Sequence, residues 1–538
     1  MASALGNIFR LGRAGIVLAQ HGVSFVPKGM KAPLPLKLAR WVTLPLQLVT
    51  WPFRIGKPKE QRVARALTSL GPSYIKLGQF LATRGDLIGL ELQRDLAHLQ
   101  DKLPPFSMAE ARRAVEEALG GKLEDHFVSF GPPVAAASIA QVHKAEVIDK
   151  ATGEKRTVAV KVLRPDVERR FKRDLDSYRF AAALIEKWYA PIRRLQPVAV
   201  VQNLEQTTTL EMDLRLEAAA ISEIADNIVR DRELVDGRWR VPSVDWRRTA
   251  KRVLTIEWID GTPISDHAKL RADGHDLNAL GLTVLRTFLR HAMRDGFFHG
   301  DMHQGNLLVE ADGTIAAVDF GIVGRLGLME RRFLAEILYG LISRDYRRAA
   351  QVHFDAGYVP PHHSVEVFAQ AMRAIGEPIH GRTADEISMA DLLGQLFAYT
   401  EVFDMKTRPE LILLQKSMVI VEGVARGLDP RLNLWTAAEP VAKEWLDMNL
   451  GLPGRLREAG EGAELMGRVL ADVPRFLSTL EATAQSVAHM SRDGWRLDDD
   501  TVDRLTRAGA KRRRGQTTAL WIGAIALSVM ALTLVLGN

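Results

Sequence analysis

Three short segments, far apart in the sequence but fixed in order, constrain this chain more than any other feature. Lys161 stands in the alternating stretch VAVKV, residues 158–162, which predicts a strand with the lysine on one face. Downstream come HGDMHQGN, which contains Asp301 and Asn306, and DFG, which begins at Asp319. Each match alone is weak, and a lone strand lysine is usually a solvated charge. Their joint occurrence in this order predicts one composite site.

Phosphoryl transfer is the chemistry that needs such a set. A γ-phosphoryl group moves only when cations neutralise its charge while the nucleophile is aligned. Protein-kinase-like sites use a strand lysine for the α- and β-phosphates, a catalytic-loop aspartate, and an asparagine and a second aspartate for Mg²⁺. The sequence therefore predicts ATP and Mg²⁺ as cofactors. Lys161 and Asp301 are the predicted catalytic residues, and Asn306 and Asp319 the predicted metal ligands.

Two departures from ordinary kinases stand beside this match. The position of the glycine-rich phosphate loop is taken by VAAASIA, residues 134–140, and no Ala-Pro-Glu follows the DFG segment. Between a proline pair and a strand, we expect the Ala-rich segment to form a stiff lid over the nucleotide. Its Cβ atoms restrict the close backbone approach that glycine allows.

The residues resemble those of the UbiB/ADCK family, the atypical kinase-like proteins of ubiquinone biosynthesis, over about residues 10–510. Four further segments carry the resemblance: KLGQ at 76–79, PVAAASIAQVH at 133–143, EMD at 211–213 and LTIEWIDG at 254–261. They look like the family's KxGQ signature, Ala-rich loop, ExD motif and hinge.

The resemblance implies a role for each of these segments. Taken alone, Lys76 would be a solvated helix charge, but the resemblance makes it an active-site residue that faces the nucleotide. Glu217 is implied to pair with Lys161 and orient it. The implied regulatory residues of the KxGQ and ExD motifs are Lys76, Gln79, Glu211 and Asp213. The implied nucleotide-binding residues, besides Lys161, are Val134, Ala135, Ala136, Ala137, Ser138, Ile139, Ala140, Gln141, Val142, Glu217, Glu257, Trp258 and Ile259.

The catalytic loop departs from the family's usual HADPHPGN at Gly300, Met302 and Gln304. No charge-binding group is lost, although the absence of two prolines should make the loop less rigid. His299 and His303 have the spacing of two zinc ligands on a helix, but no third ligand follows them, so we do not expect a zinc site here.

The order of helical and alternating segments predicts an α+β chain in which helices are followed by a small sheet with a helical insert and then by a large helical lobe. The resemblance implies that these parts form an atypical protein-kinase-like two-lobed fold, with a small sheet lobe and a large helical lobe. A helical KxGQ extension precedes the lobes, and a transmembrane helix ends the chain. The expected parts are a basic membrane-proximal segment (1–59), the KxGQ extension (60–131), the small lobe with a helical ExD insert (132–262), the large lobe with the catalytic loop and DFG (263–510), and a basic flank with the transmembrane helix (511–538).

Local signals place the strands of the small lobe. Pro132 and Pro133 should end the helical extension. After them, SIAQVHKAEVI and RTVAVKVL predict a hairpin, and VPSVDW and RVLTIEWI predict short strands. Residues 167–230 read as helical, and helices should dominate from about Leu277 onward.

Charge is concentrated at the two ends of the chain. Nine basic residues precede the first acidic residue, Glu60, and four more stand at 511–514, so the body between them is mildly acidic despite a net charge of +7. This distribution disfavours a nucleic-acid partner and favours an anionic membrane surface. The chain has no cysteine, which excludes disulfides, thiolate metal sites and a cysteine nucleophile.

The C-terminal segment predicts a membrane span. Ala519–Leu536 is almost entirely apolar and, as a helix, covers about 27 Å of a hydrocarbon core of roughly 30 Å. The basic run before it places that end in the cytoplasm. Trp41–Phe53 is either an interfacial segment or a packed linker. We expect a bacterial inner-membrane protein with one C-terminal span and a cytoplasmic body; because residues 1–59 are acid-poor like a transit peptide, the mitochondrial inner membrane is the alternative.

The leading functional hypothesis is a membrane-anchored ATPase or unorthodox small-molecule kinase that supports ubiquinone assembly. The resemblance implies that it acts on, or presents, polyprenylated quinone precursors. Membrane lipid and other ubiquinone-biosynthesis proteins are the further partners, and a homodimer is left open. A nucleotide-binding lipid chaperone or scaffold with little turnover is the alternative. A protein Ser/Thr kinase is disfavoured, because the family's KxGQ helix packs over the cleft where a protein substrate would lie.

Overall fold

The computed structural model describes residues 4–21, 62–82, 103–149, 152–188, 196–230, 238–381 and 409–450, with a few shorter positions between them. The chain divides into two units, residues 1–448 and 449–538, and nearly every described residue lies in the first. The segment Trp41–Phe53 and residues 511–538 lie outside the described residues, as does most of 1–59.

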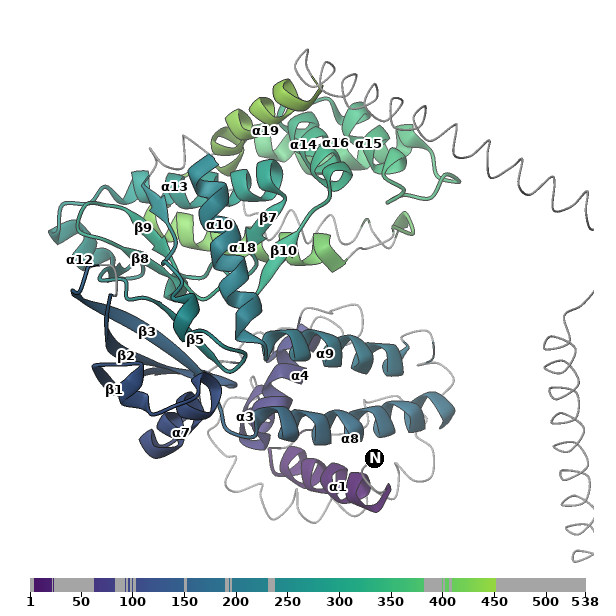
Figure 1. The fold of residues 1–538 in the computed structure, drawn as a ribbon. Coiled ribbons are helices and arrows are strands. Elements are labelled where there is room, and N and C mark those ends of the chain that lie inside the picture. Colours follow the sequence, from purple (N-terminus) through teal and green to yellow (C-terminus); the bar gives the residue numbers. More distant parts are fainter. Residues whose placement is uncertain are drawn as a thin grey trace, which may run out of the picture. The chain divides into compact units, whose positions relative to one another are not determined.

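An antiparallel sheet with the strand order β1-β2-β3-β5 forms the small lobe (Figure 1). Its strands are β1 (Ser129–Ala136), β2 (Ala140–Ile148), β3 (Lys155–Leu163) and β5 (Val253–Glu257). Alternate valines of β3 are fully buried and share a core with helix α7 (Met108–Leu119), which begins with a capping box at Ser107 and Glu110. The predicted β2–β3 hairpin and the strand at Val253–Glu257 are confirmed.

Strand β1 corrects two expectations. It begins at Ser129 and runs through Pro132 and Pro133, which were expected to end the helical extension, and it takes up the first part of the Ala-rich segment. Prolines are tolerated there because β1 is an outer strand of the sheet, and its register shifts on both sides of Pro133. A sequence pattern shows prolines but not which strand lies at an edge.

The segment VPSVDW is not the predicted strand. The chain instead has a two-residue strand, β4 (Trp239–Arg240), just before it, and one isolated bridge between Val244 and Ile256. Pro242 lacks the backbone donor that a regular ladder would need.

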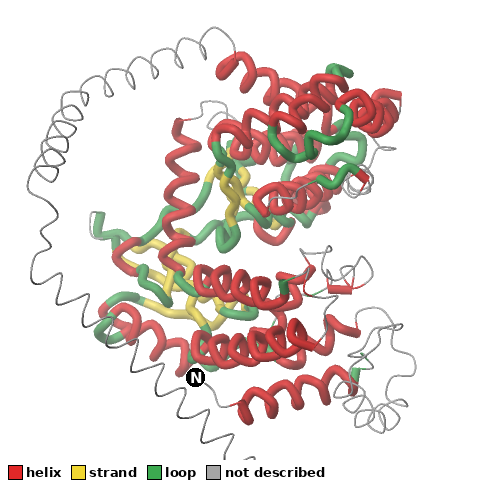
Figure 2. The backbone as a smooth tube through the Cα atoms, turned by 90° about the vertical axis from the view of Figure 1, so that its right-hand side faces the viewer, coloured by secondary structure: helices red, strands yellow, loops and turns green. Residues whose placement is uncertain are grey.

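Helices of the extension and of the insert form one packed group. The extension contributes α3 (Arg62–Leu70) and α4 (Pro72–Ala82), and α1 (Ala4–Gln20) comes from the expected membrane-proximal segment. The insert contributes α8 (Val167–Trp188), α9 (Pro197–Glu211) and α10 (Leu214–Arg230). α4 contacts both α8 and α9, which lie side by side, and α1 packs on α8 (Figures 1 and 2). The KxGQ helix and the ExD insert are thus parts of the same body.

The large lobe is mainly helical but holds short strands around the catalytic loop. β7 (Phe297–His299) pairs with β10 (Val323–Arg325), and a second sheet has the order β4-β9-β8-β6. The remaining strands are β6 (Thr262–Pro263), β8 (Leu307–Val309) and β9 (Ile315–Ala317); the helices are α12 (His267–Ala272), α13 (Leu277–Arg290), α14 (Leu328–Ile342), α15 (Tyr346–Asp355), α16 (Val365–Gly381), α18 (Pro409–Leu428) and α19 (Leu434–Leu450). The second sheet takes strands from both sides of the expected boundary at residue 262.

None of the helices in the described part of the chain is both long and apolar enough to cross a bilayer. The predicted span at 519–536 falls outside that part.

Candidate active site

Lys161 stands in the middle of the small-lobe sheet. On β3 it is opposite Val142 of β2 and Leu254 of β5. Side chains alternate along a strand, and Val160 and Val162 are fully buried on the α7 side. Lys161 therefore points to the opposite face.

Two carboxylates from distant parts of the chain meet the Lys161 ammonium. Nζ lies 2.8 and 3.0 Å from the two carboxylate oxygens of Glu217, and 2.8 Å from Oδ1 of Asp319. Glu217 stands in the first turn of α10, where the helix dipole favours a negative charge. The ion pair implied by the resemblance is present, and Asp319 joins it.

The three charges influence one another's protonation. Burial raises the pKa of Glu217, whose side chain is 7% exposed, to about 7 despite the adjacent ammonium. Burial would lower the pKa of Lys161, but the charges of Asp319 and Glu217 outweigh it and raise that pKa. The Lys161 charge in turn holds the pKa of Asp319 well below its usual range. Lys161 and Asp319 are thus ionised at neutral pH, while Glu217 titrates near it.

Asp319 adopts a strained backbone conformation that leaves part of its carboxylate open. Its φ of +62° lies in the left-handed region, which residues other than glycine rarely adopt. Lys161 and the N–H of Gly321, the latter at 3.4 Å, both bind Oδ1. Because 51% of the side chain is exposed, a ligand can reach the Asp319 carboxylate.

Hydrogen bonds within the catalytic loop hold Asp301 and Asn306 together. Nδ2 of Asn306 donates to the main-chain carbonyl of Asp301 at 3.0 Å, so the amide oxygen is the atom that remains for a cation. The N–H of Asp301 donates to Nδ1 of His299 at 3.1 Å. Burial lowers the pKa of His299, which keeps this ring neutral and able to accept. Its other nitrogen lies 3.3 Å from the carbonyl of Val318, so the loop is also tied to the strand before DFG.

A second lysine, Lys416 on α18, reaches Asp301 and was missed by the sequence analysis. Its Nζ lies 3.6 Å from Oδ1 of Asp301, while Nε2 of His303 lies 3.8 Å from Oδ2. The next residue, the buried Ser417, donates to the carbonyl of Gly300 at 2.9 Å. One signal was available, because Lys416 is the only charged residue in the apolar run LILLQKSMVIV at 411–421.

Two of the loop's departures from the family pattern have a packing explanation. Met302 is fully buried in the main core. A Cβ added at Gly300 would lie only 2.8 Å from Cγ2 of Ile322 and 3.1 Å from the Ile322 carbonyl. Glycine therefore fits a close approach between the loop and the segment after DFG.

The KxGQ and ExD motifs meet at the junction of α9 and α10. Nζ of Lys76 on α4 lies 2.8 Å from Oε2 of Glu211, the last residue of α9, and both side chains are largely buried. Asp213 instead accepts two hydrogen bonds from the Arg215 guanidinium, at 2.8 and 2.6 Å. Glu217 follows six residues after Glu211 and holds Lys161. The short stretch from Glu211 to Glu217 thus connects the KxGQ helix to the Lys161 site.

The glycine of the KxGQ motif lies where α4 packs closely on two leucine side chains. A Cβ added at Gly78 would collide with a methyl group of Leu99 and with one of Leu67. Gln79 is the next residue of α4 and is half buried. The motif therefore combines a tight helix contact with the Lys76 ion pair.

An arginine holds the turn between β1 and β2, which is the central part of the Ala-rich segment. Arg164 donates to the carbonyl of Ala137 at 3.1 and 2.8 Å, and to that of Pro104 at 2.9 Å. Within the turn, the N–H of Ala137 donates to the carbonyl of Ala140 at 2.8 Å. Ser138, at its centre, is fully buried.

The β2 residues of the predicted nucleotide-binding set divide between the two faces of the sheet. Val142 is paired with Lys161 and shares its face. Gln141 points to the α7 side, where its side chain accepts from the N–H of Phe106 at 2.9 Å and lies 2.8 Å from Nε2 of His143. Its amide binds the protein itself.

The hinge follows β5 and is already partly hydrogen-bonded. The N–H groups of Glu257 and Trp258 donate to the carbonyls of Ser243 and Thr157 at 2.8 and 3.2 Å. The Glu257 carboxylate lies 2.9 Å from Nη1 of Arg240. The third hinge N–H group, that of Ile259, makes no such backbone hydrogen bond to the described residues.

The metal-binding pair fits Mg²⁺. Asn306 and Asp319 each offer an oxygen, the donor that Mg²⁺ prefers, and each has its other polar atom fixed by the protein. Such an ion would neutralise charge on the phosphates.

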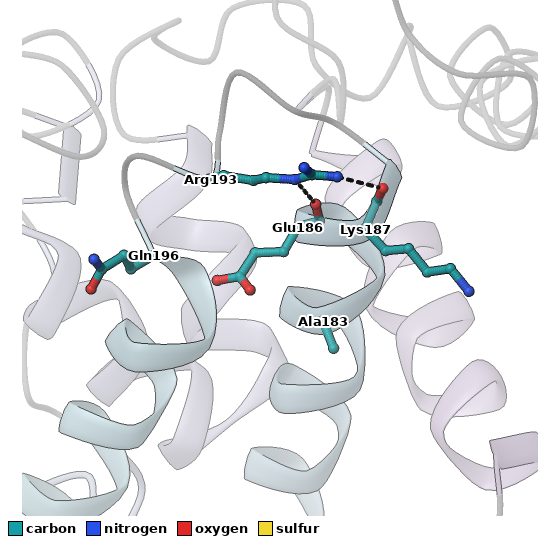
Figure 3. Close-up of a pocket in the computed structure, with 5 residues that line it drawn as sticks. All are labelled: Ala183, Glu186, Lys187, Arg193 and Gln196. Carbon is teal, nitrogen blue, oxygen red and sulfur yellow. Dashed lines mark hydrogen bonds between the residues drawn. The ribbon is translucent and has the colours of Figure 1, made fainter.

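A surface hollow elsewhere holds none of the predicted site residues. It lies between the end of α8 and the start of α9 (Figure 3). Arg193 spans it and donates to the carbonyls of Glu186 and Lys187 at 2.8 and 3.3 Å.

Fold and site together define an atypical kinase-like protein, and comparison with known proteins agrees. Residues 98–353 match the ABC1 atypical kinase-like domain, and residues 372–433 match the UbiB helical domain. A relative from Marinobacter nauticus, named probable protein kinase UbiB, is 37% identical over 458 residues, which cover 83% of this chain and 80% of the relative. One of the same name from Xanthomonas euvesicatoria pv. vesicatoria is 37% identical over 477 residues, covering 87% and 84%. The chain belongs to the UbiB family.

One solved structure, the complex of Rv3197 with erythromycin from Mycobacterium tuberculosis, is 23% identical and covers 75% of this chain and 98% of its own. Its TM-score of 0.47 is too low to carry an argument.

Proposed function

We propose that this chain binds ATP with Mg²⁺ between β3 and the catalytic loop and hydrolyses it or transfers its γ-phosphoryl group to a small hydroxyl. The observation that carries the proposal is the Lys161 ammonium, which joins Glu217 and Asp319 from separate lobes. In the bound state Lys161 contacts the α- and β-phosphates, while Glu217 keeps it in place.

The remaining residues then have definite positions around the nucleotide. The base lies on the face of the sheet that carries Val142 and Lys161, against the hinge backbone at Glu257–Ile259. The phosphates lie beneath the turn that contains Ala135–Ser138, and Asn306 and Asp319 hold the ion. The Arg164 bonds support this arrangement, because they fix the turn that covers the phosphates.

Asp301 serves the acceptor. A water or alcohol oxygen attacks the γ-phosphorus, the bond from that phosphorus to the bridging oxygen of ADP breaks, and the acceptor proton passes to the Asp301 carboxylate. Lys416 and His303 flank this carboxylate and fix its direction.

We further propose that the activity supports ubiquinone biosynthesis at the bacterial inner membrane, on or for polyprenylated quinone precursors. Membership of the UbiB family supports the pathway, and the apolar stretch at 519–536 supports the membrane. Other proteins of the same pathway are the proposed partners.

Phosphate release by the purified full chain tests the proposal. We expect steady hydrolysis of ATP that rises with detergent-solubilised quinone precursors. Asp319→Asn should lower it at least roughly 100-fold, because a charge that faces the phosphates and the ion is lost. Asp312→Asn, on an exposed loop, is the matched control and should leave the rate unchanged. Equal rates for Asp319→Asn and the unmodified chain would refute the assignment.

Two other functions give different outcomes. Tight ATP binding without turnover indicates the nucleotide-binding lipid chaperone or scaffold. Phosphate transfer to another protein in trans indicates a protein kinase, as the names of the relatives suggest for those proteins.

A further inference from the structure

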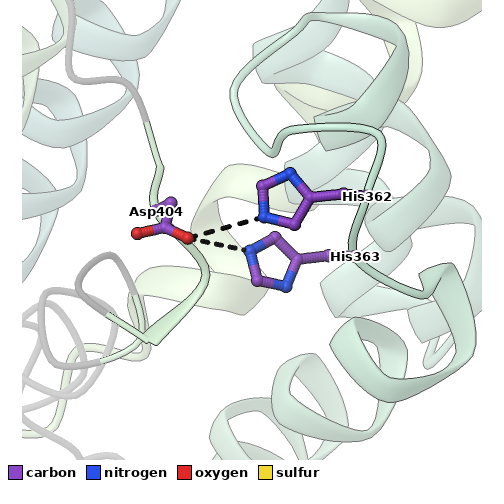
Figure 4. A group of neighbouring side chains, drawn as sticks. All are labelled: His362, His363 and Asp404. Atoms are coloured by element: carbon purple, nitrogen blue, oxygen red, sulfur yellow. Dashed lines mark hydrogen bonds and ion pairs between the residues drawn. The ribbon is translucent and has the colours of Figure 1, made fainter.

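Three metal-binding side chains converge in the large lobe, separate from the Lys161 site. His362 and His363 lie in the loop before α16, and Asp404 lies in a short segment that follows α16 in the sequence (Figure 4). One ring nitrogen of each histidine and one carboxylate oxygen of Asp404 lie within 4.8 Å of one another. Among the described residues, this is the group of three such side chains that could share a metal ion.

The contact of His363 with Asp404 is a long hydrogen bond, and both histidine–carboxylate separations match the spacing of ligands on one ion. Nε2 of His363 lies 3.3 Å and Nε2 of His362 3.6 Å from the same oxygen, Oδ2 of Asp404. A good N–H···O hydrogen bond is shorter, about 2.9 Å. Ligands at about 2.0–2.1 Å from a tetrahedral ion are roughly 3.3 Å apart. We propose that His362, His363 and Asp404 bind one divalent transition-metal ion, with Zn²⁺ as the expected species.

Packing holds both sides of the group in place. Phe403, next to Asp404, is 5% exposed, and its ring lies 4.9 Å from that of Phe368 and 5.4 Å from that of His363. On the other side, the N–H of His363 donates to the carbonyl of Pro360 at 3.2 Å. The ligands are therefore presented by anchored segments rather than by free side chains.

The ligand set defines the class of ion. Imidazole nitrogens favour zinc, cobalt and nickel over Mg²⁺ and Ca²⁺, which prefer oxygen. Three protein ligands leave a fourth position for water or a further ligand. Because the chain has no cysteine, no thiolate competes for the ion. Bound there, the ion links the loop before α16 to the segment at 402–405, independently of the nucleotide.

Metal titration of the full chain, purified without a histidine tag and kept in excess Mg²⁺, tests this site. We expect one equivalent of Zn²⁺ by calorimetry, and the visible spectrum of four-coordinate Co²⁺ when cobalt replaces it. Asp404→Asn and His362→Gln should each weaken binding at least about 10-fold. His362 is 64% exposed, so its replacement leaves the fold intact.

Two controls separate this site from others. His275→Gln, at a histidine elsewhere in the large lobe, and Asp319→Asn should bind Zn²⁺ like the unmodified chain. Zn²⁺ should also raise the melting temperature of these two proteins, but not that of Asp404→Asn. The proposal is overturned if the unmodified chain binds no stoichiometric Zn²⁺, or if His362→Gln and Asp404→Asn bind it equally well; the three residues then form an ordinary ion pair.

Discussion

At the scale of single residues, the site depends on one ammonium shared by two unequal carboxylates. Asp319 stays ionised because the Lys161 charge lowers its pKa, whereas burial brings the pKa of Glu217 to about 7. The lysine therefore keeps one partner at every physiological pH and loses the other as the solution becomes acidic.

This inequality predicts a pH dependence. Below about pH 7 Glu217 takes up a proton and its ion pair with Lys161 weakens, so kcat/KM for ATP should fall as the pH is lowered from 8 to 6. Glu217→Gln should be slower at pH 8 and lack this limb of the profile.

A raised pKa also means that the folded chain binds this proton more tightly than the unfolded chain. The stability that Glu217 contributes is therefore lost as the pH rises through 7.

The pH profiles of both proteins, measured for hydrolysis and for thermal unfolding, check the prediction. An identical limb in Glu217→Gln would assign it to another group.

Lys416 offers a second prediction at this scale. Lys416→Met removes the ammonium beside Asp301 while keeping a long apolar chain, so kcat should fall roughly 10-fold with little change in ATP affinity. Lys443→Met, on the exposed side of α19, is the matched control. Separate measurements of nucleotide affinity and single-turnover rate distinguish the two effects, and a loss confined to affinity would remove Lys416 from the acceptor side.

At the scale of elements, the junction of α9 and α10 connects two lysines. Glu211 ends one helix and binds Lys76, while Glu217 in the first turn of the next binds Lys161. Only two residues lie between the helices. A displacement of α4 that moves Glu211 should therefore also move Glu217.

A double-mutant cycle tests this connection. Lys76→Met and Glu211→Gln should each lower the free energy of unfolding by about 1–3 kcal/mol, because each removes one side of a largely buried ion pair. The double variant should lose less than the sum. Arg112 and Glu124 form an exposed pair, and the same cycle there should give less than about 1 kcal/mol. Denaturant titration measures all of these, and strict additivity at Lys76 and Glu211 would contradict the proposed coupling.

At the scale of the whole molecule, the C-terminal segment predicts where the chain resides. The protein should sediment with membranes and resist alkaline extraction if the span proposed at residues 519–536 anchors it. A chain that lacks residues 515–538 should be released by alkali, although the basic amino-terminal part still attracts it to anionic vesicles. Fractionation of cells that express each form is the measurement; retention of the shortened chain after alkaline extraction would contradict a C-terminal span.

Local sequence patterns predicted strands and the direction of a side chain, but they did not predict which distant segments come into contact. Alternation alone directs Lys161 away from the α7 core, and the hairpin follows from the turn before Lys155. The meeting of Lys76 with Glu211, and of Lys416 with Asp301, depends on helices far apart in the sequence. No periodicity encodes such contacts, and the resemblance named the two motifs of the first contact without naming the ion pair between them.

The outer strand β1 has a consequence for self-association. Two chains often join by extending one sheet into the next through unpaired backbone N–H groups. Pro132 and Pro133 have no such groups, and the register shifts beside them twist that border out of line. A second copy of this chain therefore cannot extend the sheet by a regular strand along these residues.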